Sequence, residues 1–243
     1  MMKVWIDAGH GGKDPGKVDN GLKEKDIVLN ISLNVKKRLE SEYEGVQVML
    51  TRSTDIFVEL DERTKAANKA GADILVSIHC NGAGGAGGFE SFRYTNPQTA
   101  SVTLQNVLHT EIMTALKPFG VIDRKQKAAN LHMVRESKMP AVLTENLFID
   151  VATDAERLKR IEVINALIDG HVKGIAKYLG LKSKEGAKME NTERDINKVS
   201  PWAEVVWKDM SEKKYFDGTR PGAPITREEM AIVLSRVINS LSK

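Results

Sequence analysis

The chain has 243 residues, of which 41% are hydrophobic and 28% are charged, with a formal net charge of +3. This composition is typical of a globular protein with room for one domain of ordinary size and a smaller module. The basic excess suits an anionic polymer as partner, but it is too weak to predict nucleic-acid binding.

The beginning of the sequence predicts where the protein is made. The first residues run directly into an apolar segment at 4–6, without a signal sequence. No apolar run approaches the roughly 18 residues of a membrane span, so we expect no membrane partner. We therefore expect synthesis in the cytoplasm, and an action outside the cell needs a separate release step. The single cysteine, Cys80, excludes a disulfide within the chain.

Apolar strands alternate with amphipathic helices through the first 180 residues. Strands are expected at 4–6, 46–50, 74–78, 89–94 and 140–144. Helices are expected at 23–39, 60–70, 99–116 and 153–179, the second ending at Gly71 and the last opening with a capping box and ending at Gly180. This alternation predicts an α/β fold with a mostly parallel sheet. Between these elements, we expect a polar, basic loop on the substrate side at 121–130 and a short strand at 131–134.

The composition changes after Gly180. Residues 181–198 are rich in charged side chains and carry few apolar ones, which favours a solvated linker. Apolar residues then return, and those after Thr226, a candidate N-cap, recur at helical spacing. We predict a domain at 1–180, a linker at 181–198 and a small helical module at 199–243.

Four candidate functional residues lie near the ends of predicted elements. His10 lies in a glycine-rich loop after the first strand, His79 and Glu145 each follow a strand, and Glu24 opens the first long helix. Parallel α/β sheets bind ligands beyond the carboxyl ends of their strands. Two imidazoles and one carboxylate form a common catalytic zinc set, and the remaining carboxylate can act as general base. The alternative for Glu24 is a purely structural role at the helix N-terminus.

Three motifs carry a resemblance to a known family. Residues 4–12 resemble the opening signature of the zinc-dependent N-acetylmuramoyl-L-alanine amidases of the type 3 family. Residues 77–81 are similar to the second histidine motif of that family, and residues 140–145 to the segment that ends in its catalytic glutamate. The resemblance covers roughly residues 3–179, and it implies a twisted, mostly parallel sheet flanked by helices.

The resemblance also implies a role for each candidate residue. Zn²⁺ would be held by His10, Glu24 and His79, and Glu145 would be the general base. The substrate of the enzyme would be peptidoglycan, cleaved at the amide bond between N-acetylmuramic acid and L-alanine. The missing signal sequence suggests a phage endolysin released through a holin, or a mother-cell lytic amidase of a sporulating bacterium. Two alternatives stay open: another zinc hydrolase of the wall peptide, such as a carboxypeptidase, and a wall-binding protein with an inactive amidase fold.

The single cysteine and the other three histidines are weaker candidates for the functional site. Cys80 stands where the family more often has a small residue, but side chains alternate along a strand, so Cys80 is expected to point away from His79 into the core. His109 and His171 lie in predicted long helices and are expected as surface or packing residues. His132 is a candidate lining residue of the substrate groove.

The C-terminal module resembles one S-layer homology repeat. The matching segments are 202–203, 215–221 and 224–229. That family binds secondary polymers of Gram-positive cell walls, usually through repeats in threes, and one copy is visible here. The alternative is a helical module that forms a dimer or packs on the catalytic domain.

Overall fold

The structure, a computed structural model, describes residues 1–184, 208 and 211–213. The chain divides into two units, Met1–Ala187 and Lys188–Lys243. Apart from residues 181–184, 208 and 211–213, the predicted linker and the predicted module at 199–243 lie outside the described residues. Their assignment therefore stays a prediction, and the fold described here is that of the first unit.

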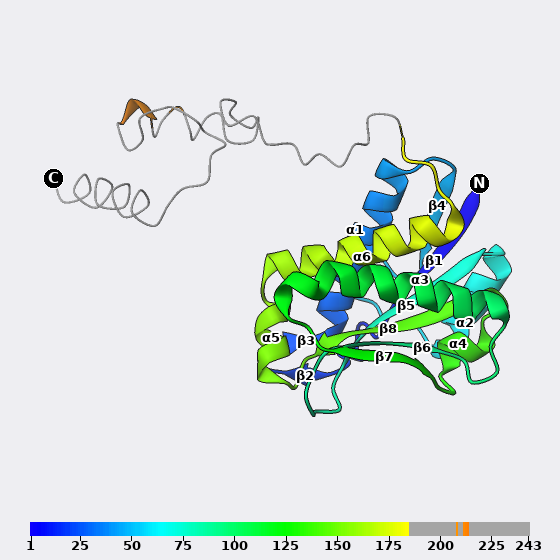
Figure 1. Cartoon of the computed structure of the whole chain (residues 1–243), viewed down its shortest axis with the longest axis horizontal. Helices are drawn as coiled ribbons and strands as arrows, with labels where there is room; N and C mark the ends of the chain where they lie inside the picture. Colours follow the sequence, from blue (N-terminus) through cyan, green and yellow to red (C-terminus); the bar gives the residue numbers. More distant parts are fainter. Residues whose placement is uncertain (185–207, 209–210, 214–243) are drawn as a thin grey trace. The chain divides into compact units, whose positions relative to one another are not determined.

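A six-stranded sheet in the order β4-β1-β5-β8-β6-β7 forms the centre of this unit (Figure 1). The strands are β1 (Met2–Ala8), β4 (Val46–Leu50), β5 (Ile74–Asn81), β6 (Phe89–Arg93), β7 (Asp123–Ala128) and β8 (Ala141–Phe148). Every neighbouring pair is parallel except β6 and β8, which are antiparallel. The mostly parallel sheet predicted from the alternation of strands and helices is therefore confirmed. A separate two-stranded hairpin, β2 (Val18–Asp19) and β3 (Leu22–Lys23), was not predicted.

Helices cover both faces of the sheet (Figure 1). The first face is covered by α1 (Glu24–Glu42), α3 (Thr99–Leu116) and α6 (Ile161–Leu179), and the second by α2 (Leu60–Ala70) and α4 (His132–Glu136). Alternation along the strands sorts the side chains between the two faces. In β1, for example, Val4 and Ile6 join the larger apolar cluster under the first face, whereas Trp5 joins the smaller cluster under the second.

Three expectations for the connecting segments are wrong. Residues 123–128 form β7 at the sheet edge rather than a loop, because an edge strand can keep polar side chains on both faces. Residues 132–136 form α4 rather than a strand, since so short an apolar run fits either period. The predicted helix 153–179 is divided into α5 (Ala152–Leu158) and α6.

The predicted capping box is wrong as well, because no side chain caps α5. The carboxylate of Asp154 instead accepts hydrogen bonds from the backbone N–H groups of Gly88 and Phe148, which hold the loop before β6 against the end of β8. The two predicted glycine C-caps are confirmed, at Gly71 for α2 and at Gly180 for α6.

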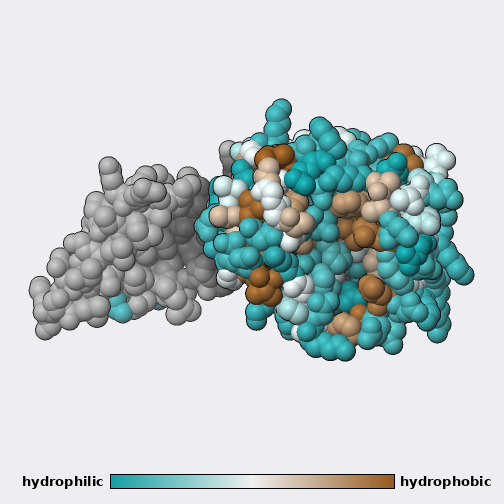
Figure 2. Space-filling model, turned by 90° about the horizontal axis from the view of Figure 1, so that it is seen from below, coloured by the Kyte–Doolittle hydropathy of each residue, from teal (hydrophilic) through white to brown (hydrophobic). Residues whose placement is uncertain are grey.

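The surface of the described part shows no broad apolar area on the face drawn in Figure 2, where brown side chains form small groups separated by hydrophilic ones. Within the described ranges, no helix has both the length and the apolar character needed to cross a bilayer. Among the residues that the structure describes, the large exposed apolar side chains belong to Met1, Met2, Val18, Leu33, Ile56, Leu60, Ile122 and Ile161.

Candidate metal centre and active site

His10, Glu24 and His79 converge on one point although they come from three separate parts of the chain. The Oε1 atom of Glu24 lies 3.1 Å from His10 Nε2 and 3.0 Å from His79 Nδ1. The two imidazole nitrogens are 3.2 Å apart. These three atoms form a group that could hold a metal ion, with Glu24 buried and both histidines partly exposed.

The local backbone brings the two histidine rings together. His10 lies in the loop after β1 with a φ of 58°, in the left-handed region. Glycine is required beside the rings: a Cβ atom at Gly9 would lie 2.3 Å from the His79 ring. At Gly16, whose φ is also positive, a Cβ atom would meet the carboxylate of Glu24 at 2.6 Å. The glycine-rich composition of this loop therefore serves the close approach of side chains.

Asp14 orients the His10 imidazole. The Nδ1 atom of His10 lies 2.8 Å from Asp14 Oδ2, and the other carboxylate oxygen of Asp14 accepts the backbone N–H of Gly16. Such a carboxylate fixes the ring with Nδ1 protonated and leaves Nε2 free to bind a metal. Asp14 is not among the site residues predicted from the sequence. The signal available was its position four residues after His10 in the same loop.

Glu24 is a buried carboxylate whose oxygens are both engaged. Besides the two histidines, Oε1 accepts the backbone N–H of Cys80 and Oε2 accepts that of Lys17. Burial alone would raise the pKa of Glu24, but the hydrogen bonds and charges of His10 and His79 outweigh it and hold the pKa far below its usual range. Burial lowers the pKa of His10, but the hydrogen bonds and charges of Glu24 and Asp14 outweigh this effect and raise the pKa to about 9. The site is therefore built around an ionised carboxylate, which is the form that binds cations.

Glu145 lies beside this group on the next strand. It was expected at the end of a strand, but β8 continues to Phe148, and Glu145 pairs in register with His79 of β5. Its Oε2 atom is buried and has no hydrogen-bond partner among the described residues. Burial raises the pKa of Glu145 to about 7, in spite of the opposing effect of His79. A carboxyl group with such a pKa can exchange a proton near neutral pH.

Two buried arginines, which were not predicted for this role from the sequence, hold the loop that carries His10. Arg63 of α2 donates hydrogen bonds to Asp7 Oδ1 and to the carbonyl oxygens of Ala8 and His10. Arg52 donates to the carbonyl oxygens of Ala8 and Gly9. Buried carbonyl groups in a loop need such donors, and the planar guanidinium can serve several at once.

The other cysteine and histidine candidates lie outside the metal group. Cys80 is buried in the apolar cluster under α1, α3 and α6, as expected, and is not part of the metal group. His109 and His171 are buried packing residues, and neither lies at the surface. His132 lies within 3.2 Å of Thr64 Oγ1, and its role as a groove residue stays a prediction.

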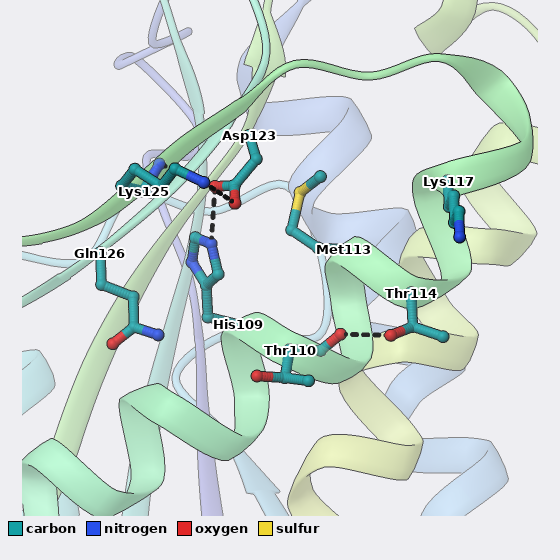
Figure 3. A pocket seen from close by; sticks show the side chains of 8 residues that line it. All are labelled: His109, Thr110, Met113, Thr114, Lys117, Asp123, Lys125 and Gln126. Carbon is teal, nitrogen blue, oxygen red and sulfur yellow. Dashed lines mark hydrogen bonds and ion pairs between the residues drawn. The ribbon is translucent and has the colours of Figure 1, made fainter.

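A separate open pocket of about 580 Å³ lies between α3 and β7 (Figure 3). His109 Nε2 and Lys125 Nζ both contact the Asp123 carboxylate in this pocket, each at 2.9 Å. The other ring nitrogen of His109 lies 2.9 Å from Ser91 Oγ, but Ser91 is fully buried and cannot reach a substrate. This Ser-His-Asp chain joins β6, α3 and β7, and the pocket contains none of the four candidate site residues.

Two imidazoles and a carboxylate near the carboxyl ends of the parallel strands, with a second carboxylate beside them, are typical of metal-dependent hydrolases. Residues 4–177 match the N-acetylmuramoyl-L-alanine amidase family Amidase_3, and the chain belongs to this family. The chain is therefore an amidase of cell-wall hydrolysis, as the resemblance of its motifs implied.

Individual relatives agree with this family. The endolysin of Bacillus phage SPP1 is 51% identical over 185 residues, which are 75% of this chain and 68% of the phage protein. The sporulation-specific N-acetylmuramoyl-L-alanine amidase of Bacillus subtilis strain 168 is 42% identical over 217 residues, which are 89% of this chain and 83% of that protein. Among solved structures, the catalytic domain of the amidase CwlV from Bacillus (Paenibacillus) polymyxa superposes with a TM-score of 0.70 at 36% identity, covering 75% of this chain and all of that domain.

Proposed function

We propose that this amidase depends on zinc and that His10, Glu24 and His79 hold the ion. The observation that carries the proposal is the triangle of donor atoms, whose sides measure 3.0–3.2 Å. Ligand atoms about 2.0–2.1 Å from a tetrahedral zinc ion lie roughly 3.3 Å apart, so the triangle fits. Three protein ligands also leave one position open, which is typical of a catalytic site.

Glu145 is the general base of this proposal. Bound zinc would polarise the amide carbonyl and lower the pKa of the attacking water. Glu145 takes up the proton of that water and returns it to the nitrogen of the departing L-alanine. The buried Oε2 atom of Glu145, which has no hydrogen-bond partner among the described residues, and the raised pKa of Glu145 both support this role. The strand pairing with His79 supports it too, because it holds the carboxylate beside the proposed ligands.

The substrate is peptidoglycan, and the cleaved bond joins N-acetylmuramic acid to L-alanine. We propose that the protein is made in the bacterial cytoplasm and reaches the wall after release. A phage endolysin released through a holin and a mother-cell lytic amidase are both compatible with the two relatives, one from a phage and one from sporulation.

For residues 199–243 we propose binding to a secondary polymer of the cell wall. The support is the likeness of residues 202–203, 215–221 and 224–229 to one S-layer homology repeat. This region lies almost entirely outside the described residues. The rival role, dimerisation or packing on the catalytic domain, is compared with it by the truncation experiment described below.

One experiment tests the proposed reaction and its metal. Purified peptidoglycan is digested with the full chain, with and without a chelator, and the products are analysed by mass spectrometry. We expect new N-terminal alanine, loss of its release on chelation, and recovery with added Zn²⁺. Release of D-alanine instead would indicate a carboxypeptidase, and wall binding without any product would indicate an inactive fold. Activity that survives complete removal of metal would contradict the zinc proposal.

A further inference from the structure

A second charged group lies on the same sheet face as Glu145. Its centre is Glu90 of β6, a buried residue directly opposite Glu145 in the antiparallel pair β6–β8. Directly opposed side chains have Cβ atoms about 4.5–5.5 Å apart and share one face. The Oε1 atom of Glu90 accepts a hydrogen bond from Asn81 Nδ2. Its Oε2 atom accepts from Arg124 Nε and from Lys127 Nζ, both on β7.

This group carries more positive than negative charge. Burial raises the pKa of Glu90, but its hydrogen bonds from Lys127 and Arg124 outweigh that effect and lower it, so Glu90 is a single negative charge facing two positive ones. The side chains of Arg124 and Lys127 remain 30% and 38% exposed. The terminal nitrogens of Arg124 have no hydrogen-bond partner in the part of the chain that the structure describes. The group therefore presents free donors and a net positive charge to a ligand.

Packing fixes the orientation of the free donors. The guanidinium carbon of Arg124 lies 4.6 Å from the centre of the Phe148 ring, and Phe148 is buried. An arginine that is stacked on a ring and bonded through Nε has little freedom left, so its fork is ordered before any ligand arrives. A planar carboxylate accepts two parallel hydrogen bonds from such a fork.

The order of strands places this group on a particular side of the reaction. The strands β5, β8, β6 and β7 lie side by side in this order (Figure 1). In the same order they carry His79, then Glu145, then Glu90, then its two cations. A base that protonates the leaving amine must lie within hydrogen-bond reach of that nitrogen. The peptide part of the substrate therefore begins at Glu145, and the cations lie farther along the sheet, away from His79. This step rests on the proposed role of Glu145.

We propose that Arg124 and Lys127 form a binding site for a free carboxylate on the peptide part of the substrate. Neighbouring strands lie about 4.8 Å apart, which puts β7 roughly 10 Å from β8. An extended peptide covers about 3.3–3.6 Å per residue, so the bound carboxylate belongs to the second or third residue after the cleaved amide. The site thus selects wall peptides that carry a negative charge at this position.

The test uses two synthetic N-acetylmuramoyl tripeptides and the full chain loaded with zinc. One substrate has free carboxylates on its second and third residues, and the other has both as primary amides. The variants are Arg124→Gln and Lys127→Gln, each of which leaves Glu90 one cationic partner. Lys125→Gln is the matched control, because it removes a lysine of the same strand that is 77% exposed and contacts Asp123 instead of Glu90.

We expect the wild-type enzyme to favour the free-carboxylate substrate by about tenfold or more in kcat/KM, mainly through KM. Either variant should bring this ratio close to one, and the control should keep it. A variant that lowers kcat/KM equally for both substrates would show a structural role and overturn the proposal. Equal cleavage of both substrates by the wild type would overturn it as well, with the proposed function intact. Failure to cleave either substrate would overturn the proposed function and this inference together.

Discussion

His79 and Glu145 are direct neighbours across the parallel strands β5 and β8, and their side chains lie on the same face of the sheet. No hydrogen bond joins them: His79 Nδ1 faces Glu24 and His10, while Glu145 Oε2 has no partner within the described ranges. The pairing of the strands therefore sets the distance between a proposed ligand and the proposed base. Because no hydrogen bond joins the two side chains, each role can be tested by its own substitution.

Loss of either histidine should abolish zinc binding. In His10→Ala or His79→Ala a site with three proposed ligands would retain two, so we expect loss of stoichiometric zinc and of lytic activity. Elemental analysis of purified protein measures the first effect and turbidity of cell-wall suspensions the second. Zinc retained at full stoichiometry in either variant would remove that residue from the ligand set. His132→Ala serves as the matched control for the zinc measurement, since His132 lies outside the metal group.

Glu145→Gln should separate zinc binding from catalysis. The amide keeps the shape of the side chain and removes its basicity, so zinc content and substrate binding should persist while turnover falls by about 10²–10⁴-fold. Single-turnover assays with purified peptidoglycan measure the rate. Loss of zinc in this variant would make Glu145 a ligand and reopen the role of Glu24. Near-normal turnover would mean that another group carries the proton.

Arg63 should be needed for stability and for the shape of the His10 loop. Arg63→Met leaves the Asp7 carboxylate buried without its cationic partner, and removing one partner of a buried ion pair typically costs about 3–5 kcal/mol. Urea unfolding of the metal-free protein measures this change. Lys65→Met on the same helix is the control, because its ion pair with Asp61 is exposed and its loss should have a much smaller effect. Equal stability of the two variants would contradict the proposed role of Arg63.

The variant Arg63→Lys tests the loop itself. Lysine preserves the charge beside Asp7 but cannot serve the carbonyl groups of Ala8 and His10 together. We therefore expect weaker zinc binding than in the wild type, measured by competition with a chelator, even where the variant remains folded. Unchanged zinc affinity would show that the loop keeps its shape without this arginine.

Buried His171 should make the catalytic domain less stable in acid. Its Nδ1 atom lies 2.7 Å from the Leu167 carbonyl oxygen and its Nε2 atom 3.1 Å from Thr144 Oγ1. Burial lowers the pKa of His171 from 6.5 to about 4. As the pH falls below 6.5 the unfolded chain takes up this proton and the folded chain does not, so stability falls until the pH reaches about 4.

The expected loss is about 2 kcal/mol between roughly pH 7 and pH 5. Urea unfolding at both pH values measures it in the wild type and in His171→Gln, which should lose about that much less. The other histidines are present in both proteins, so the difference isolates His171. An identical loss in the two proteins would show that His171 does not cause the acid sensitivity.

Truncation after residue 187 should leave a folded catalytic unit. The first unit ends at Ala187, and the described members of its two apolar clusters all precede this point. We expect the truncated protein to cleave soluble muropeptide as the full chain does and to bind intact walls less well in a pelleting assay. Equal wall binding by both proteins would contradict the proposed role of residues 199–243, and a change in oligomeric state would favour the dimerisation alternative.

Much of the fold followed from local patterns. The strands around residues 46–50 and 74–78 and the helices at 60–70 and 99–116 were predicted within a few residues, because continuous burial of one face leaves a periodic trace in the sequence. The polar strand β7 and the short helix α4 left no such trace. An edge strand needs no alternation, and an apolar run of a few residues is shorter than the period that would identify it.

The sequence by itself determined the class of the fold, the order of the motifs and the residue types from which a metal site could be built. Only the tertiary structure decided which groups meet: Asp14 on His10, His79 opposite Glu145, and Arg124 with Lys127 on Glu90. The physical reason is that periodicity records the burial of each segment separately. Strand register and the partners of buried charges instead depend on contacts between segments far apart in the chain. A single sequence holds no direct record of those contacts.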